Sequence, residues 1–220
     1  MTPIEQDAPL GRRDLRKQQT RAALTGAALR LCALRGFDQV TVDDISTEAG
    51  VSSRTFFNYF ASKEDAVLGD HLVEVDAMRA RLAVLLPTMP VLEAVRRAVL
   101  LVVAAMEADR DHWFLRMEII QRSPQLLPRL VLSNAEAERA TTEQIAAHLG
   151  VDPIAHGYPA LVVAATSASF RVAATRWMAA AGRLSLGALV DEAFSGLAAG
   201  LPDPDIPPPR PRAGAPVPPG

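Results

Sequence analysis

The sequence predicts an all-α protein built from a three-helix N-terminal head and a larger C-terminal helical bundle, with about nine helices in all. Strand-like alternation of apolar and polar residues is nearly absent, and alanine is abundant throughout. Apolar residues instead recur every three or four positions between capping residues, glycines and prolines. The expected helices span residues 14–35, 42–49, 53–60, 63–85, 90–109, 111–122, 125–149, 153–182 and 186–200.

Composition is typical of a globular protein, because 49% of the 220 residues are hydrophobic and 22% are charged. The longest apolar run, Ala98 to Met106, is far shorter than the roughly 20 residues that cross a bilayer. The N-terminal segment carries acidic residues and no apolar core, so it lacks the pattern of a secretory signal. We therefore expect a cytoplasmic protein with no membrane partner.

Residues that support catalysis or metal binding are sparse. The one cysteine, Cys32, excludes an intramolecular disulfide and cannot by itself supply a thiolate metal site. It falls on an apolar helix face, where core packing explains it. The four histidines lack metal-ligand spacing, and no glycine-rich phosphate loop or nucleophile elbow is present. The sequence thus predicts no catalytic residue, no metal and no cofactor.

Four segments are expected along the chain: a disordered arm (1–13), the head (14–62), the bundle (63–201) and a disordered tail (202–220). The tail holds nine prolines in nineteen positions and almost no large apolar side chain, so it cannot pack a core. Residues 12–63 contain nine Lys and Arg against five Asp and Glu, and the remainder of the chain is mildly acidic. A basic head suits a protein that binds nucleic-acid phosphates, although many solvated helix faces carry as much charge.

The head contains the local signals of a helix-turn-helix. Thr41 caps a short second helix, and Asp44, three residues later, is positioned to complete a capping box. Gly50 permits the sharp turn that follows, and Ser52 caps the third helix. The turn is three or four residues long, as the motif requires.

The third helix presents polar side chains outward. It is too short to be stable alone, so Phe56 and Phe60 must anchor it to its neighbours. Arg pairs with guanine, Asn with adenine and hydroxyls with phosphate oxygens, while an aromatic ring can touch a thymine methyl. Lys63 begins a fourth helix, where a phosphate contact or a solvated surface position would each account for it. The outward residues with this chemistry are Ser53, Arg54, Thr55, Phe57, Asn58 and Tyr59.

The run TVDDISTEAGVSSRTFFNYFASKEDAV, residues 41–67, resembles the helix-turn-helix signature of the TetR family of bacterial regulators. The match includes the Ala-Gly-Val turn, the Tyr-Phe pair and Ser-Lys-Glu, and it covers about fifty residues from Arg16 to Leu68. The resemblance implies that Thr41, Thr55, Tyr59 and Lys63 hold phosphates while Ser53, Arg54, Phe57 and Asn58 lie toward base edges. Phe57 departs from the tyrosine often found there, so a hydroxyl contact is lost. We expect the DNA-binding residues to be these eight together with Ser52.

The resemblance also implies a bundle with a central cavity for a small-molecule effector. The segment 112–122 combines aromatic, methionine and charged residues, a mixture expected where an apolar pocket has a few polar anchors. The candidate effector-binding residues are Trp113, Phe114, Met117, Glu118, Gln121, Phe170 and Trp177, although the aromatic ones equally suit a packed core. The run from Arg54 to Asp70 is similar to TetR relatives associated with acyl-coenzyme-A-type ligands and mycofactocin gene clusters. An acyl-CoA or another hydrophobic compound is therefore a candidate effector.

The last two helices are expected to pair with those of a second chain in a four-helix bundle, giving a homodimer. Dimerisation is needed because two recognition helices must enter successive major grooves of operator DNA. The expected interface residues are Leu186, Leu189, Val190, Ala193, Phe194 and Leu197, with an intrachain packing face as the alternative.

The sequence as a whole predicts a ligand-responsive transcriptional regulator, most simply a repressor released from a palindromic operator. Two other classes compete with this interpretation: an enzyme, which lacks any catalytic motif here, and an architectural DNA-binding protein without a ligand. A ligand-induced release from DNA would exclude the second. Whether the protein represses or activates depends on the position of its operator, which the sequence does not encode.

Overall fold

The computed structural model describes residues 12–69 and 71–202, and every regular element in this part of the chain is a helix. The arm predicted to be disordered lies outside the described residues except for its last two positions, which belong to the first helix. The predicted tail also lies outside them, apart from Pro202. The head consists of α1 (Arg12–Arg35), the 3₁₀ turn η1 (Phe37–Gln39), α2 (Val42–Glu48), α3 (Ser53–Phe57) and α4 (Lys63–Leu68).

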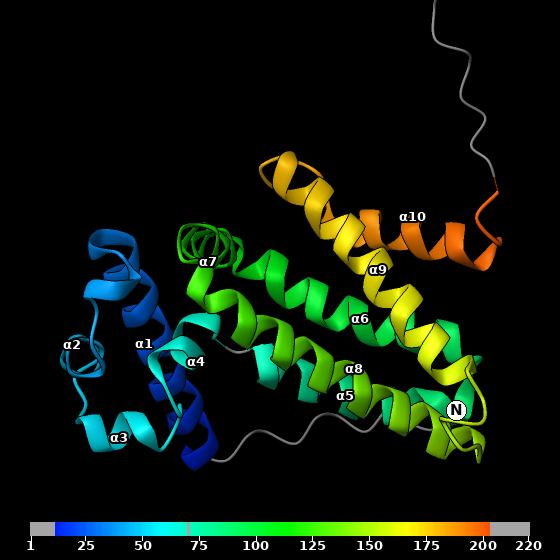
Figure 1. Cartoon of the computed structure of the whole chain (residues 1–220), viewed down its shortest axis with the longest axis horizontal. Helices are drawn as coiled ribbons and strands as arrows, with labels where there is room; N and C mark the ends of the chain where they lie inside the picture. The colour runs from blue at the N-terminus through cyan, green and yellow to red at the C-terminus, as the bar shows by residue number, and fades with distance from the viewer. Residues whose placement is uncertain (1–11, 70, 203–220) are drawn as a thin grey trace, which may run out of the picture.

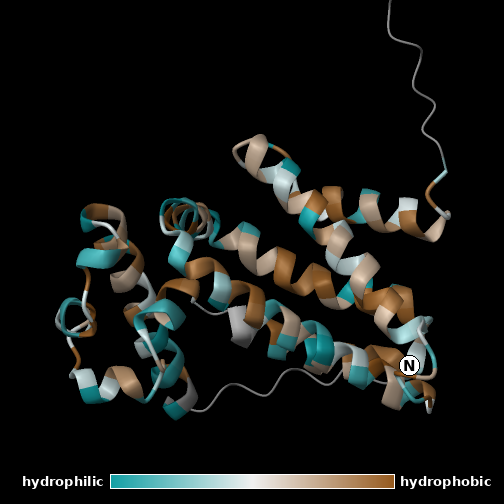
Figure 2. Cartoon of the chain, in the orientation of Figure 1, coloured by the Kyte–Doolittle hydropathy of each residue, from teal (hydrophilic) through white to brown (hydrophobic). Residues whose placement is uncertain are grey.

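The body forms a second group of helices beside the head (Figure 1). Its elements are α5 (His71–Leu85), η2 (Leu86–Thr88), α6 (Val91–Ala108), α7 (Arg110–Arg122), η3 (Pro124–Leu126), α8 (Leu127–Leu149), α9 (Tyr158–Ala179) and α10 (Leu186–Ala198). Figure 2 shows hydrophobic residues concentrated along α6, which runs through the middle of the body. The all-helical fold class is therefore confirmed.

The helix expected over residues 63–85 is instead two helices, α4 and α5, which separate at Gly69. This glycine has a φ of 72°, a left-handed conformation that ends a helix and that side chains other than glycine rarely adopt. A Cβ atom added at Gly69 would meet the guanidinium group of Arg116 on α7. The backbone conformation thus favours glycine at the break, whereas the flexible Arg116 side chain could move aside for a larger residue.

Two hydrophobic cores hold the protein together, and α7 contributes to both. Ile119 and Ile120 of α7 and Leu126 of η3 belong to the head core, where they pack with residues of α1 to α4. Trp113 and Phe114, one to two turns earlier on α7, pack against the body core, to which α5, α6, α8, α9 and α10 all contribute. The head is consequently completed by residues that lie more than fifty positions beyond its own last helix.

Most of the predicted dimer residues on α10 are buried within their own chain. Leu186, Leu189, Val190 and Phe194 are at most 5% exposed and belong to the body core. Ala193 and Leu197 are partly buried. Helical spacing identified the apolar face of α10 correctly, but that face packs against α6 and α9, so it offers little surface to a second chain.

Polar contacts fix α10 against α6. Glu107 near the end of α6 accepts hydrogen bonds from the backbone N–H groups of Leu186 (2.6 Å) and Gly187 (3.4 Å). A carboxylate at this position satisfies amides that have no partner inside α10 and complements the partial positive charge of the helix N-terminus. Arg96 of α6 also pairs with Asp191 of α10. Among the described helices, none is long and apolar enough to cross a bilayer.

Replacement of Phe194 by alanine will destabilise the monomer core. The ring is 2% exposed, so its loss leaves a cavity and we expect the free energy of unfolding to fall by roughly 3–5 kcal/mol. Chemical denaturation followed by circular dichroism measures this change. Val84→Ala on the exposed side of α5 is the control, with an expected change within about 0.5 kcal/mol. A folded Phe194→Ala variant of unchanged stability would show that α10 is not part of the core.

Candidate nucleic-acid interface and effector pocket

The start of the helix-turn-helix is fixed by the predicted capping box. The Asp44 backbone N–H donates to Thr41 Oγ1 (3.1 Å), and the Thr41 backbone N–H donates to Asp44 Oδ2 (2.9 Å). The Thr41 hydroxyl also donates to the same carboxylate oxygen at 2.6 Å. These bonds to Thr41, with a smaller contribution from Arg35, lower the pKa of Asp44 below its ordinary value. The bonds hold Thr41 at the entrance to α2, as the sequence predicted.

Three residues shape this part of the head: Gly50 allows the turn after α2, Ser52 caps α3, and the buried Phe56 ring anchors α3. Gly50 has a φ of 70°, which allows the chain to reverse between α2 and α3. Ser52 Oγ accepts a hydrogen bond from the Thr55 backbone N–H at 3.1 Å. Phe56 is fully buried in the head core and is the anchor that the sequence predicted. The helix ends at Phe57 rather than at residue 60, so Asn58 is its C-cap.

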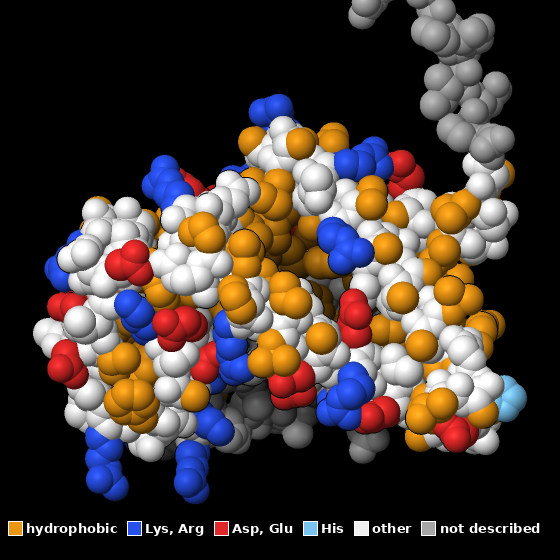
Figure 3. All heavy atoms as spheres, in the orientation of Figure 1, with side chains coloured by type: hydrophobic (Ala, Val, Ile, Leu, Met, Phe, Trp, Pro, Cys, Tyr) orange, Lys and Arg blue, Asp and Glu red, His pale blue; other side chains and the backbone are white. Residues whose placement is uncertain are grey.

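The structure gathers most of the predicted DNA-binding residues on α3 and its flanks. Ser52, Arg54, Phe57 and Asn58 are exposed, and Phe57 is 59% exposed although it is a large aromatic residue. The exposed ring lies beside an arginine and an asparagine, a combination whose chemistry suits contact with bases. Figure 3 shows basic side chains projecting from the lower edge of the head, over α3 and the start of α1.

Ser53, Thr55 and Tyr59 are only partly exposed, since each takes part in contacts within the head. Ser53 Oγ donates to Asp43 Oδ1 at 2.6 Å, and the Thr55 and Ser52 hydroxyls lie 2.9 Å apart. The backbone carbonyl of Tyr59 accepts a hydrogen bond from Arg21, whose guanidinium also lies 4.3 Å from the centre of the Phe60 ring. Arg21 therefore joins α1 to the end of the recognition segment, a role that sequence spacing did not indicate.

Lys63 binds the protein's own backbone. Its ammonium donates to the carbonyl oxygens of Phe37 and Val40, both at 3.0 Å, and lies 4.3 Å from the centre of the Phe37 ring. The sequence predicted a phosphate contact or a solvated position for this residue. In the structure two of its three N–H groups are used to hold η1 against α4, which is a stabilising role inside the head.

Polar contacts connect the head to the body beside the shared hydrophobic core. Arg116 of α7 donates to the Val67 carbonyl of α4 (3.2 Å), and Arg129 of α8 pairs with Asp65 of α4 (2.8 Å). Gln125 of η3 donates to Asp38 of η1 at 2.8 Å. Of these contacts, that of Arg116 starts from α7, which carries most of the predicted effector residues, and the sequence alone gave no indication of the pairs.

The predicted effector residues fall into two neighbouring groups. Trp113, Phe114 and Trp177 form an aromatic cluster, with ring centres between 5.0 and 5.8 Å apart, and Trp177 is 1% exposed. Phe170 packs against the same core. A surface depression of about 500 Å³ lies beside this cluster. It is lined by Asp111, Phe114, Leu115, Met117, Glu118, Gln121 and Met178, which include four of the seven predicted residues.

The surface of the body is hollowed between α7 and α9, above α6, and hydrophobic side chains surround the hollow (Figure 3). Asp111, Leu115 and Met178 were not among the predicted residues, and Met178 comes from α9, more than fifty positions away in sequence. The part of the chain that the structure describes contains no group of three or more His, Cys, Asp or Glu side chains suited to a metal ion. The lining residues make the effector depression a mainly apolar surface with a few acidic and amide groups at its edge.

Two family models match the chain. Residues 24–68 match the TetR family of bacterial regulatory proteins, and residues 89–202 match the MftR C-terminal domain. Among curated proteins, the transcriptional regulator TcmR of Streptomyces glaucescens is 30% identical over 184 residues, which are 80% of this chain and 81% of TcmR. The putative mycofactocin biosynthesis regulator MftR of Mycobacterium tuberculosis is 31% identical over 111 residues, 50% of this chain and 56% of that protein.

The fold is also similar to solved structures. Thermus thermophilus FadR, a transcriptional repressor solved in complex with lauroyl-CoA, superimposes with a TM-score of 0.52 over 86% of this chain and 98% of FadR. The two sequences are 22% identical, so this likeness concerns the fold alone.

Replacement of Lys63 by methionine will weaken the head in the absence of any ligand. Methionine retains most of the apolar stem but removes the ammonium and its two hydrogen bonds, so we expect the free energy of unfolding to fall by about 1–3 kcal/mol. Thermal denaturation of the purified protein measures the effect. Lys17→Met on the exposed face of α1 serves as the matched control. A Lys63→Met protein as stable as the original would contradict the structural role.

Proposed function

Because the chain belongs to the TetR family of bacterial DNA-binding transcriptional regulators and is not an enzyme, we propose that it is a homodimeric repressor released from a palindromic operator by a small apolar or acyl-type effector. One observation carries the ligand-responsive part of this proposal. Helix α7 borders the effector depression and also supplies Ile119 and Ile120 to the core of the DNA-binding head. A shift of α7 would therefore change both the shape of the effector depression and the packing of the DNA-binding head.

The proposed DNA contacts centre on α3. Arg54 and Asn58 have the chemistry to pair with guanine and adenine in the major groove, and Phe57 exposes a ring to thymine methyl groups. Thr41, Ser52, Ser53, Thr55 and Tyr59 are proposed to contact phosphates or base edges near them. For Lys63 the intramolecular bonds favour an indirect role, in which it positions η1 and α4.

The proposed dimer uses the outward face of α9 in place of the α10 residues predicted from the sequence. Leu161 is 67% exposed and Val172 is 56% exposed. With Ala165 and Ala168 between them they follow a spacing of four, three and four residues, so they share one side of the helix. Small residues between larger apolar ones allow two helices to approach closely, and a second copy of α9 is the partner we propose.

Coupling would run from the effector depression through α7 to α4. Phe114, Met117 and Gln121 face the depression, while Arg116 on the same helix donates to the Val67 carbonyl beside the glycine break. A ligand that moves α7 would move this contact and so change the separation of the two heads in the dimer. Since successive major grooves are about 34–36 Å apart, a changed separation lowers operator affinity. The ligand acts only through its different affinity for the two arrangements.

The effector class rests on the lining of the depression. Phe114, Leu115, Met117 and Met178 supply an apolar wall that suits an acyl chain or another hydrophobic body. The complex of T. thermophilus FadR with lauroyl-CoA is consistent with an acyl compound in this fold. Lauroyl-CoA is therefore a suitable first compound to test.

Operator recognition can be tested by footprinting the protein on the DNA upstream of its own gene. We expect a nearly palindromic site. Asn58→Ala should relax discrimination at one base position of each half-site by about 5–100-fold, while Tyr59→Phe should weaken binding to all sequences similarly. Asn134→Ala on the exposed side of α8 is the control. Equal loss at every base from the Asn58 change would contradict its proposed base contact.

Effector response can be tested by titrating the operator complex with lauroyl-CoA. We expect a decrease in operator affinity of about tenfold or more, the usual size of an allosteric coupling. Coenzyme A without the acyl chain is the control, and calorimetry measures direct binding of each compound to the protein. If lauroyl-CoA binds tightly but operator affinity stays the same, the proposed coupling is wrong.

A further inference from the structure

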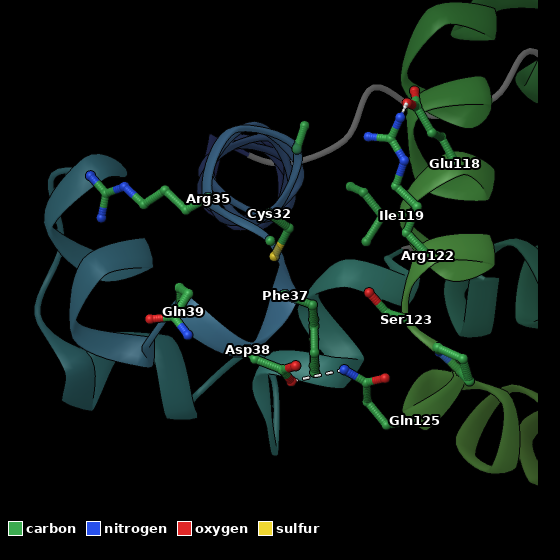
Figure 4. Close-up of a pocket in the computed structure, with 13 residues that line it drawn as sticks. Cys32, Arg35, Phe37, Asp38, Gln39, Glu118, Ile119, Arg122, Ser123 and Gln125 are labelled. Carbon is green, nitrogen blue, oxygen red and sulfur yellow. Dashed lines mark hydrogen bonds and ion pairs between the residues drawn. The ribbon is translucent and has the colours of Figure 1, made fainter.

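A second cleft lies at the junction of head and body, on the side of α7 away from most of the effector depression. Its walls come from the end of α1, from η1, from the last turn of α7 and from η3, and its volume is about 500 Å³ (Figure 4). This volume falls within the range of small-molecule sites, which is roughly 300–1,000 Å³. The walls from α1 and η1 belong to the head and those from α7 and η3 lie some eighty residues later, so the cleft exists only while head and body are held together.

The inner wall of the cleft is apolar. Figure 4 shows the Cys32 sulfur and the Ile119 side chain directed into the space between α1 and α7, with Phe37 beside them. Each of these residues is 4% exposed. Burial raises the pKa of the Cys32 thiol to about 11, so this wall carries no thiolate at neutral pH. The wall would accept the apolar part of a ligand.

One polar group inside the cleft has no partner in the described part of the chain. Ser123 is 5% exposed, and its hydroxyl is directed toward the space between α1 and α7. Its backbone N–H donates to the Ile120 carbonyl, but no hydrogen bond from its hydroxyl is found among residues 12–69 and 71–202. Ser123 Oγ is not among the fully buried, unpartnered side-chain atoms of the described residues, so it reaches the open space of the cleft, where a bound molecule can hydrogen-bond to it.

The charged residues at the edge of the cleft are balanced. Arg122 pairs with Glu118 at 2.7 Å, Arg35 pairs with Asp44 at 3.5 Å, and Asp38 accepts the hydrogen bond of Gln125. Two arginines and two acidic residues line the cleft, so its edge carries no net charge that would attract a charged ligand. The lining therefore favours an uncharged molecule.

We propose that the junction cleft binds a small uncharged molecule with an apolar body and one hydrogen-bonding group, which contacts the Ser123 hydroxyl. Such a ligand touches α1 and η1 of the head together with α7 and η3 of the body. It binds only the arrangement in which these elements lie together, and it thereby stabilises that arrangement. This site is distinct from the effector depression, with which it shares only Glu118.

The proposal can be tested with 2-naphthol, which is uncharged at neutral pH, and with 2-naphthoate, which has the same ring system but carries a negative charge. We expect calorimetry to detect one 2-naphthol per chain and 2-naphthoate to bind at least tenfold more weakly. Ser123→Ala should weaken 2-naphthol binding about fivefold, the usual effect of one lost hydrogen bond. Equal binding of the two compounds, or a Ser123→Ala variant that binds as well as the original, would overturn the proposal.

A blocking variant shows where the compound binds. Ala33 lines the cleft from an exposed position on α1, so Ala33→Phe fills the space without disturbing the core. Leu34→Phe, at the next position, is 82% exposed and does not line the cleft, which makes it the matched control. We expect Ala33→Phe to abolish 2-naphthol binding and Leu34→Phe to retain it, with unchanged circular dichroism for both. Binding that survives Ala33→Phe but is lost in Gln121→Trp would assign the compound to the effector depression and overturn the proposal.

Discussion

The simultaneous packing of α7 into two hydrophobic cores is the constraint on which the rest of the structure depends. Its first half contributes Trp113 and Phe114 to the body, and its second half contributes Ile119 and Ile120 to the head. Protein interiors are packed as densely as organic crystals, so a helix shared in this way cannot be displaced without repacking both sides. The head is for this reason an extension of the body rather than an independent module on a linker.

Polar contacts across the junction determine the orientation of the head relative to the body. Arg116, Gln125 and Arg129 reach from the body to carbonyl or carboxylate oxygens of α4 and η1. The first and last of these contacts are partly buried, and together the three define how the head is turned relative to α7. Glu118 lines both the effector depression and the junction cleft. Helix α7 is thus bordered by open space on two sides, and a bound molecule on either side has room to act on it.

The sequence predicted the parts of this protein that depend on local chemistry. The capping box of Thr41 and Asp44, the Ser52 cap, the buried Phe56 and most helix boundaries are determined by residues within a few positions of one another. The break at Gly69 was missed because a glycine is tolerated inside a helical pattern, and the apolar spacing continues across it.

The sites were harder to predict because they depend on contacts between residues that lie far apart in the sequence. The spacing on α10 revealed an apolar face but not whether that face meets α6 and α9 or a second chain, since both partners require the same periodicity. Likewise, Lys63 stands in the signature of a DNA-binding segment, yet its ammonium is taken by the Phe37 and Val40 carbonyls, more than twenty positions earlier. Four of the seven predicted effector residues line the depression because they share one helix.

The placement of the two indole rings has a spectroscopic consequence. Trp113 and Trp177 are the only tryptophans of the chain, and the centres of their rings lie 5.1 Å apart in the body. The head contains no tryptophan, and its one tyrosine is Tyr59. Emission excited at the red edge of the absorption band therefore originates from one spot beside α7. The molecule carries a natural optical label there, and melting of the recognition segment alone would leave its emission nearly unchanged.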